Sequence, residues 1–196
     1  AVRFLNVPSF LYKRDVRVST ATFGDVTVDI AFGGAMYAVL PAAAVGLDVA
    51  PEHTTDLIGL GREIRDDLNA RGVAEHPEDE RLSGIYGTIF TAPGDQRLHQ
   101  RNCTVFADGE VDRSPCGSGT AARVAMLADS GDLTEDDVLE HESIVGTRFT
   151  AVIAGRGTAY GRAAVVPAVT GSAYRVGTSV FTVDPHDQIT PGFVLR

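Results

Sequence analysis

Basic residues are in short supply in this sequence. The chain has 17 lysine and arginine residues against 26 aspartate and glutamate residues, so its formal net charge is -9 at pH 7. Nucleic acids and anionic membranes bind proteins through clusters of positive charge, and we therefore expect neither as a partner. An anionic substrate would have to be held by backbone amides and helix dipoles rather than by a basic patch.

Long apolar runs are also missing. No run approaches the roughly 18 residues that a membrane-spanning helix requires, and no charged segment followed by an apolar one marks a leader. The composition, with 44% hydrophobic and 22% charged residues over 196 positions, is that of a folded chain with a sizeable core. We expect a soluble, cytoplasmic protein.

Cysteine is scarce, and metal-binding spacings are absent. The two cysteines, Cys103 and Cys116, do not make a disulfide framework, and no Cys-x-x-Cys or His-x-x-x-His pair is present to hold zinc. The lysine of a Walker phosphate loop and the second glycine of a dinucleotide fingerprint are missing too. We therefore expect no metal. The five histidines are scattered and are interpreted as surface or structural residues: His53, His76, His99, His141 and His186.

The residues with recognisable chemistry lie between positions 110 and 131. Pro115 and Cys116 are followed by Gly-Ser-Gly-Thr and then by a run of small apolar residues that stops at Gly131. This pattern predicts a loop that leads into a helix with Cys116 at its N-terminus. A helix that is apolar around nearly its whole circumference is usually buried, so we expect the rest of the chain to surround it.

The N-terminus of this helix suits both anion binding and thiol chemistry. The first helical amides have no partner within the helix, and the dipole makes that end electropositive. The amides of Gly117 and Ser118 are therefore candidates to bind a carboxylate or a phosphate. The same field stabilises a thiolate, so Cys116 is expected to be more acidic than a free thiol. The alternative is that Cys116 is an inert buried side chain, which is how we interpret Cys103.

Most of the remaining chain is predicted to form strands around that helix, which makes the fold class α+β. Alternating apolar residues predict a β-hairpin over 14–31 with its turn near Gly24, and Gly33-Gly34 then permits a close backbone approach. Apolar residues at helical spacing predict a helix over 55–70 on the outside of the sheet, capped by Gly72. Further predictions are strands at 1–11, 84–91, 102–107, 139–153, 159–166 and 172–183, a short helix at 41–45 and an exposed loop at 75–81.

The segment DRSPCGSGTAAR resembles the second catalytic motif of the proline racemase family. This family includes proline racemases, hydroxyproline epimerases and trans-3-hydroxy-L-proline dehydratases. Further motifs of the family follow in order along nearly the whole chain: LNVPSF, DIAFGGAMYAV, HP at 76–77, YGTIFT, HESIVGTRF and VPAVTGSAYRVGTSVF, followed by DP and GF.

The resemblance implies two similar halves, each an antiparallel sheet curled around a central helix, as in diaminopimelate epimerase. The active site would lie between the halves. This chain would be the second half, one α/β domain over residues 1–196, and about 188–196 would be a candidate segment for returning to the first half. We expect such a chain to be a fragment or one partner of a split enzyme, inactive alone, that binds the missing N-terminal half or forms a homodimer.

The resemblance also implies roles for individual residues, without a cofactor. Cys116 would be the base and acid of this half, and the amides of Gly117 and Ser118 would bind the substrate carboxylate. Asp112 would bind the ring nitrogen of proline or hydroxyproline, although it would otherwise simply cap a turn. Inversion needs a second acid on the opposite face of the substrate, and the family's other catalytic cysteine has no counterpart here.

The reaction stays open between alternatives. A proline racemase or hydroxyproline epimerase is the leading interpretation, and a trans-3-hydroxy-L-proline dehydratase that needs one base is the close alternative. YGTIFT and GSGTAAR are similar to the dehydratases, although those resembling the animal enzyme carry threonine at the position of Cys116. 4-Hydroxyproline epimerases often place a histidine near Thr88, which is absent here. A non-catalytic module that binds imino acids is the third hypothesis.

Overall fold

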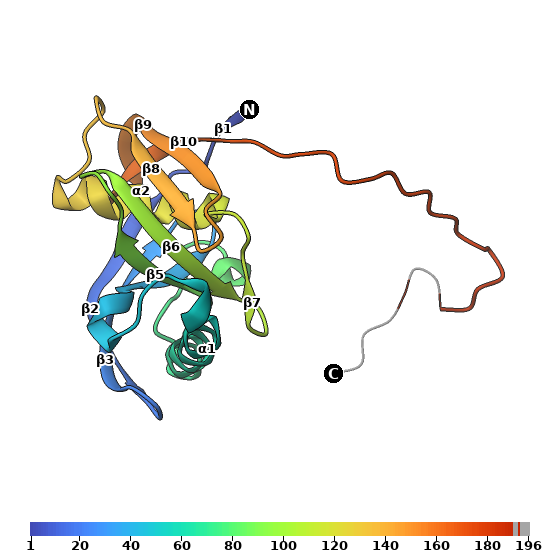
Figure 1. Cartoon of the computed structure of the whole chain (residues 1–196), viewed down its shortest axis with the longest axis horizontal. Coiled ribbons are helices and arrows are strands. Elements are labelled where there is room, and N and C mark those ends of the chain that lie inside the picture. The colour runs from blue at the N-terminus through green and yellow to red at the C-terminus, as the bar shows by residue number, and fades with distance from the viewer. Residues whose placement is uncertain (190–191, 193–196) are drawn as a thin grey trace.

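The computed structural model describes residues 1–189 and 192. Within them a sheet wraps around helix α2 (Gly117–Ser130), and helix α1 (Thr54–Ala70) packs on the outside of the sheet (Figure 1). The strands of this part of the chain are β1 (Val2–Leu5), β2 (Phe10–Thr20), β3 (Gly24–Phe32), β4 (Met36–Pro41), β5 (Ile85–Pro93), β6 (His99–Phe106), β7 (Glu110–Val111), β8 (Leu139–Ser143), β9 (Arg148–Ala159) and β10 (Arg162–Gly171).

The strand order is β1-β10-β9-β8-β6-β5-β4-β3-β2, with β7 paired to β6. The sheet is largely antiparallel, as the sequence predicts, but β4 with β5 and β6 with β8 are parallel pairs. At one edge β1 lies along β10, where Val2 is opposite Gly171. The link from β1 to β2 also follows β10, because Ser9 and Val165 exchange backbone hydrogen bonds of 2.8 and 2.9 Å. The first and last strands therefore curve around α2 together.

The two helices pack on opposite faces of β3, β4 and β5, because side chains alternate along a strand. One set faces α2 and forms a cluster with Cys116 and Met126: Ala31, Tyr37, Val39 and Ile89. The other set faces α1 and packs with Leu57, Leu60 and Ile64: Ile30, Ala38, Leu40 and Phe90. The predicted positions of both helices, one enclosed and one outside, are confirmed.

Helix α2 passes close to the turn between β3 and β4. A Cβ atom on Gly33 would lie 2.1 Å from the carbonyl oxygen of Ser118 and 2.5 Å from the amide nitrogen of Ala122. Only glycine permits this contact, so the close approach predicted at Gly33-Gly34 is confirmed at Gly33. Helix α2 ends where Gly131 adopts a φ of 81°, as the sequence predicts.

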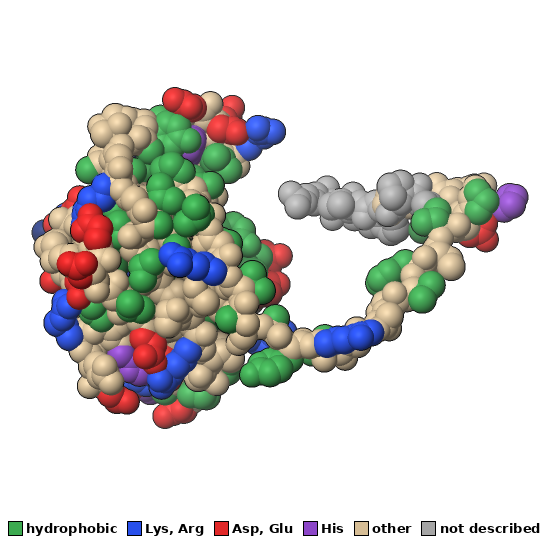
Figure 2. All heavy atoms as spheres, turned by 90° about the horizontal axis from the view of Figure 1, so that it is seen from above, with side chains coloured by type: hydrophobic (Ala, Val, Ile, Leu, Met, Phe, Trp, Pro, Cys, Tyr) green, Lys and Arg blue, Asp and Glu red, His purple; other side chains and the backbone are tan. Residues whose placement is uncertain are grey.

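Two expectations about irregular segments are wrong. No strand forms over 172–183; this segment leaves the body in an extended conformation (Figures 1 and 2) and carries exposed apolar side chains, namely Tyr174, Val176, Val180, Phe181 and Val183. The segment that continues directly from β10 cannot extend the sheet beside β10, because β10 is already paired on both sides, with β1 and β9. The loop over 75–81 is not fully exposed either, because His76 is buried between Phe32 and Tyr160.

The single strand predicted over 139–153 is two strands, β8 and β9, separated by a turn over residues 144–147. The 41–45 helix is the single 3-10 turn Ala42–Val45. The predicted return segment at 188–196 falls mainly on residues 190–191 and 193–196, which lie outside the described residues. In the part of the chain that the structure describes, no helix is both long enough and apolar enough to cross a membrane.

Candidate active site

The loop between β7 and α2 is fixed by its own side chains. Oδ1 of Asp112 accepts hydrogen bonds of 2.8 Å from both the amide and the hydroxyl of Ser114. The Ser114 hydroxyl oxygen in turn accepts from the amide of Cys116 at 3.1 Å. Asp112 therefore caps the turn that delivers Cys116, and its Oδ2 atom accepts no hydrogen bond from the described residues.

Cys116 adopts a φ of 63° and a ψ of 120°, in the left-handed region that a residue with a Cβ rarely occupies. Such a conformation persists only where the surroundings enforce it. Here two side chains fix the peptide just before Cys116. The carbonyl oxygen of Pro115 accepts hydrogen bonds from Asn102 Nδ2 at 2.8 Å and from Thr120 Oγ1 at 3.1 Å.

His141 completes this network beneath the loop. Its Nδ1 lies 2.8 Å from Thr120 Oγ1, and its Nε2 lies 2.9 Å from Asn102 Nδ2. If Nδ1 of His141 carries the proton, every one of these contacts has a donor and an acceptor, and both Thr120 and Asn102 direct hydrogens to Pro115. Complete burial lowers the pKa of His141 to about 3, so this imidazole stays neutral and supports the loop without titrating at neutral pH.

The sulfur of Cys116 has three polar neighbours. The amide of Gly119 donates to Sγ at 3.3 Å, Tyr37 Oη lies 3.5 Å from Sγ, and Ser118 Oγ lies 3.8 Å from it. A Cβ atom on Gly119 would sit 3.1 Å from Sγ and 3.0 Å from the Ile89 side chain. Glycine at position 119 therefore lets the amide reach the sulfur.

The expectation of an acidic thiol is wrong for this chain. Cys116 is only 7% exposed, and this burial raises its pKa above the usual value, although hydrogen bonds from Tyr37 and Gly119 act in the opposite direction. A charge removed from water is destabilised more than a few hydrogen bonds at the helix end compensate. Cys103 is buried on β6 with no such donors, and burial raises its pKa to about 12.

Two amides at the same helix end remain available. The first helical hydrogen bond runs from the Thr120 amide to the Cys116 carbonyl at 2.8 Å, and among the described residues the amides of Gly117 and Ser118 donate to no acceptor. A Cβ atom on Gly117 would meet only the ring of Phe4, at 3.4 Å. The structure thus places the buried Cys116 beside the partly exposed Gly117 and Ser118 at the helix N-terminus, which is the position that the sequence predicts.

The sequence predicts no role for Tyr37 or Asn102, and for His141 only the surface or structural role given to all five histidines. Tyr37 and His141 occur in DIAFGGAMYAV and HESIVGTRF, but nothing in the local pattern sets them apart from other polar residues of a strand. The one available signal was their position within motifs that the family shares. Their contact with the Cys116 loop exists only because the sheet brings together β8, β6, β5 and β4, in that order.

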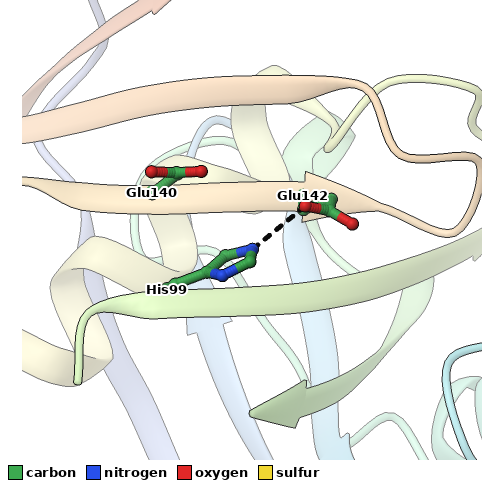
Figure 3. A group of neighbouring side chains, drawn as sticks. All are labelled: His99, Glu140 and Glu142. Atoms are coloured by element: carbon green, nitrogen blue, oxygen red, sulfur yellow. Dashed lines mark hydrogen bonds and ion pairs between the residues drawn. The ribbon is translucent and has the colours of Figure 1, made fainter. Parts of the chain in front are cut away.

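A second polar cluster contains residue types that can bind a metal ion. His99, Glu140 and Glu142 place ligand atoms within 4.8 Å of one another on β6 and β8 (Figure 3). Nε2 of His99 bonds Glu142 at 3.0 Å, while its Nδ1 accepts from the Asp95 amide at 3.1 Å. Arg148 forms ion pairs with both glutamates. The cluster is therefore an ion-pair network that joins β6, β8 and β9, and its histidine has the structural role that we expect.

The fold and this helix terminus define the class of protein. The chain belongs to the proline racemase family, because residues 1–194 match the family described as proline racemase. The solved hydroxyproline epimerase of Agrobacterium vitis, with bound trans-4-hydroxy-L-proline, superposes with a TM-score of 0.88 at 32% sequence identity, over 98% of this chain and 55% of that one. The predicted family and the α+β fold class are both confirmed.

Particular relatives differ in their named activity. The chain is 48% identical over 196 residues to a 3-hydroxyproline 2-epimerase of Burkholderia multivorans and 46% identical to a trans-3-hydroxy-L-proline dehydratase of Azospirillum brasilense. It is 39% identical over 195 residues to a 4-hydroxyproline 2-epimerase of Streptosporangium roseum. These matches cover all of this chain but only 58%, 58% and 59% of the three relatives. The chain thus spans a little over half of their length.

Proposed function

We propose that this chain supplies the Cys116 side of an active site that removes the α-proton of a hydroxyproline. The observation that carries the proposal is the placement of the Cys116 sulfur beside the free amides of Gly117 and Ser118, at the N-terminus of α2. A thiolate there is a base, and the two amides with the helix dipole bind a carboxylate. The charge that develops when the α-proton leaves is delocalised onto that carboxylate, where the same amides stabilise it.

The raised pKa of Cys116 is consistent with a thiol that becomes a thiolate, and thus a base, only when the substrate binds. An imino acid carries a positive ring nitrogen, and a positive charge near a thiol lowers its pKa. Oδ2 of Asp112 is the atom proposed to bind that nitrogen, since Oδ1 is occupied by Ser114. The substrate would thereby offset part of the effect of burial on Cys116 at the moment of reaction.

Inversion of configuration needs a second acid on the opposite face of the substrate. Cys103 does not supply it, because it packs in the cluster that faces α1, away from Cys116. We propose that the second group comes from the part of the longer relatives that this chain does not span, and that the chain alone does not epimerise. Elimination of water from a 3-hydroxyproline needs only one base to remove the α-proton while the neighbouring hydroxyl leaves.

We favour a 3-hydroxyproline as the substrate, because the more similar relatives act on 3-hydroxyproline by name and the named 4-hydroxyproline epimerase is less similar. Epimerisation is the leading reaction and dehydration the second candidate. The test supplies the chain together with the remaining part of a relative and follows α-deuterium incorporation, optical rotation and pyrroline formation with trans-3-hydroxy-L-proline, trans-4-hydroxy-L-proline and L-proline.

Cys116→Ala is expected to abolish turnover, while Cys103→Ala retains it per folded molecule. Full turnover by Cys116→Ala would remove the cysteine from the mechanism. Full epimerisation by the unaccompanied chain would show that the second acid lies within it. Binding of pyrrole-2-carboxylate without turnover on any substrate would instead favour the imino-acid-binding module, and equal affinity for the corresponding amide would remove the carboxylate site.

A further inference from the structure

The environment of Tyr37 points to a role beyond packing. Tyr37 lies on β4 and is fully buried, and its ring packs edge-on against Tyr86 with 5.8 Å between ring centroids. Its hydroxyl nevertheless faces polar atoms: Oη is 2.7 Å from Ser118 Oγ and 3.5 Å from Cys116 Sγ. A phenol is seldom buried without use of its hydroxyl, and here both available contacts belong to the proposed active site.

The hydroxyl of Tyr37 has one proton and two possible acceptors. Burial raises the pKa of Tyr37 far above its usual value, so the phenol stays neutral at any pH at which the enzyme would work. Beside a neutral thiol, the shorter contact to Ser118 Oγ is the better hydrogen bond. Beside a thiolate, the sulfur becomes the stronger acceptor, because hydrogen bonds to charged groups are stronger than those between neutral groups.

We propose that Tyr37 is a positioning residue for the Cys116 thiolate, whose hydroxyl turns from Ser118 Oγ to Sγ when the thiol loses its proton. This assignment rests on the proposed role of Cys116 as a base. Together with the Gly119 amide, Tyr37 then gives the thiolate a second fixed donor. The buried sulfur can ionise without water, and it is held in one orientation toward the substrate.

The test is the pH dependence of Cys116 alkylation in Tyr37→Phe, which removes one oxygen atom and leaves the ring. Iodoacetamide rates are read for each cysteine by mass spectrometry. Because the substitution removes a hydrogen bond to the charged sulfur, the pH midpoint of Cys116 alkylation should move up by about one unit. At a fixed pH below the midpoint, this shift corresponds to roughly tenfold slower alkylation. Tyr86→Phe is the matched control, because no hydrogen bond of its hydroxyl reaches the site, and its profile should not move.

Ser118→Ala provides a second measurement that does not depend on changing Tyr37. Without Ser118 Oγ the Tyr37 proton has Sγ as its remaining acceptor at the site, and this gain should outweigh the loss of the long 3.8 Å contact between Ser118 Oγ and Sγ, so the Cys116 midpoint should fall. In a Tyr37→Phe background only the loss of that contact remains, so the same change should raise the midpoint slightly instead, which is the non-additivity expected of groups in one network. Equal shifts in both backgrounds, or no shift in Tyr37→Phe, would overturn the assignment.

The two proposals can fail separately. In the complete enzyme, Tyr37→Phe is expected to lower kcat several-fold with KM nearly unchanged and to move the acidic limb of the pH profile, where activity rises as the base loses its proton, upward in the same direction as the alkylation profile. If no hydroxyproline is turned over but the alkylation midpoint still shifts, the proposed function fails and the assignment of Tyr37 stands. If turnover occurs and neither profile shifts, Tyr37 is only a packing residue.

Discussion

At the scale of single residues, opposing effects meet at Cys116. The helix N-terminus favours a thiolate, and the sequence alone makes that effect visible because Pro115, Cys116 and the flanking glycines are consecutive. Burial disfavours a thiolate, and it arises from Tyr37 and Ile89, which are distant in the chain. Tyr37 and Cys116 are 79 residues apart in the sequence. The residues next to Cys116 therefore predict the position of the thiol correctly, but they do not reveal its burial, and so its acidity is predicted wrongly.

The two cysteines should differ in reactivity. In the chain as described, iodoacetamide should modify Cys116 before Cys103, and the Cys116 rate should still be rising near pH 9, because burial raises both pKa values but only Cys116 has hydrogen-bond donors at its sulfur. Peptide mass spectrometry over a pH series measures this. A plateau of the Cys116 rate below pH 8 would mean that the helix terminus outweighs burial after all.

The neutral His141 predicts that stability depends on pH. Its pKa is about 3 in the folded chain against a usual value of 6.5, so only the unfolded chain binds its proton between these values. The free energy of unfolding should therefore fall as the pH drops from 6.5 toward 3, by at most about 1.4 kcal/mol per pH unit from this residue.

Urea denaturation of His141→Asn at several pH values tests this linkage. The variant loses stability at pH 7 because the network at Pro115 is disturbed, but its decline on acidification should be shallower. His186→Asn is the control, since that side chain is 93% exposed and should leave the slope unchanged. Parallel slopes for His141→Asn and the native chain would contradict a buried neutral imidazole.

At the scale of elements, the contact between α2 and the β3–β4 turn depends on the absence of a side chain. Gly33→Ala would force a Cβ atom into the backbone of α2, which cannot yield as a flexible side chain can. We expect a loss of about 3 kcal/mol or more in the free energy of unfolding, measured by chemical denaturation. Gly59→Ala, on the exposed side of α1 with nothing near its added Cβ, should instead be neutral or stabilise by up to about 1 kcal/mol.

The elements themselves follow largely from local patterns. The hairpin of β2 and β3, helix α1 and helix α2 are predicted to within a few residues because periodicity and glycine caps decide them. The failure at 172–183 has a different origin. That segment has a strand-like composition, but a strand forms only with a partner strand, and β10, from which the segment continues, is already paired with β1 and β9. The parallel pairing of β4 with β5 and of β6 with β8 likewise depends on which strands become neighbours in the sheet. The residue pattern within one strand does not determine its neighbours.

At the scale of the whole molecule, the segment after β10 extends away from the body and exposes several large apolar side chains. Tyr174 is 87% exposed and Phe181 is 91% exposed, and contiguous exposed apolar side chains commonly mark an interaction site. Limited trypsin digestion should cut first after Arg175, while Arg156 and Arg162 in the paired strands resist. The cleavage products identify the site. Slower cleavage after Arg175 in the complete enzyme would show that another part of the protein covers this segment.

The pairing of β1 with β10 has a consequence for biosynthesis. Val2 lies opposite Gly171, so the edge strand made early waits for a partner made late, and α2 cannot be enclosed until that partner has left the ribosome. Contacts between such distant residues slow folding, and an unpaired edge is prone to aggregation meanwhile. This part of the nascent chain should therefore need protection until β10 has emerged, and its sheet should close in one cooperative step after that.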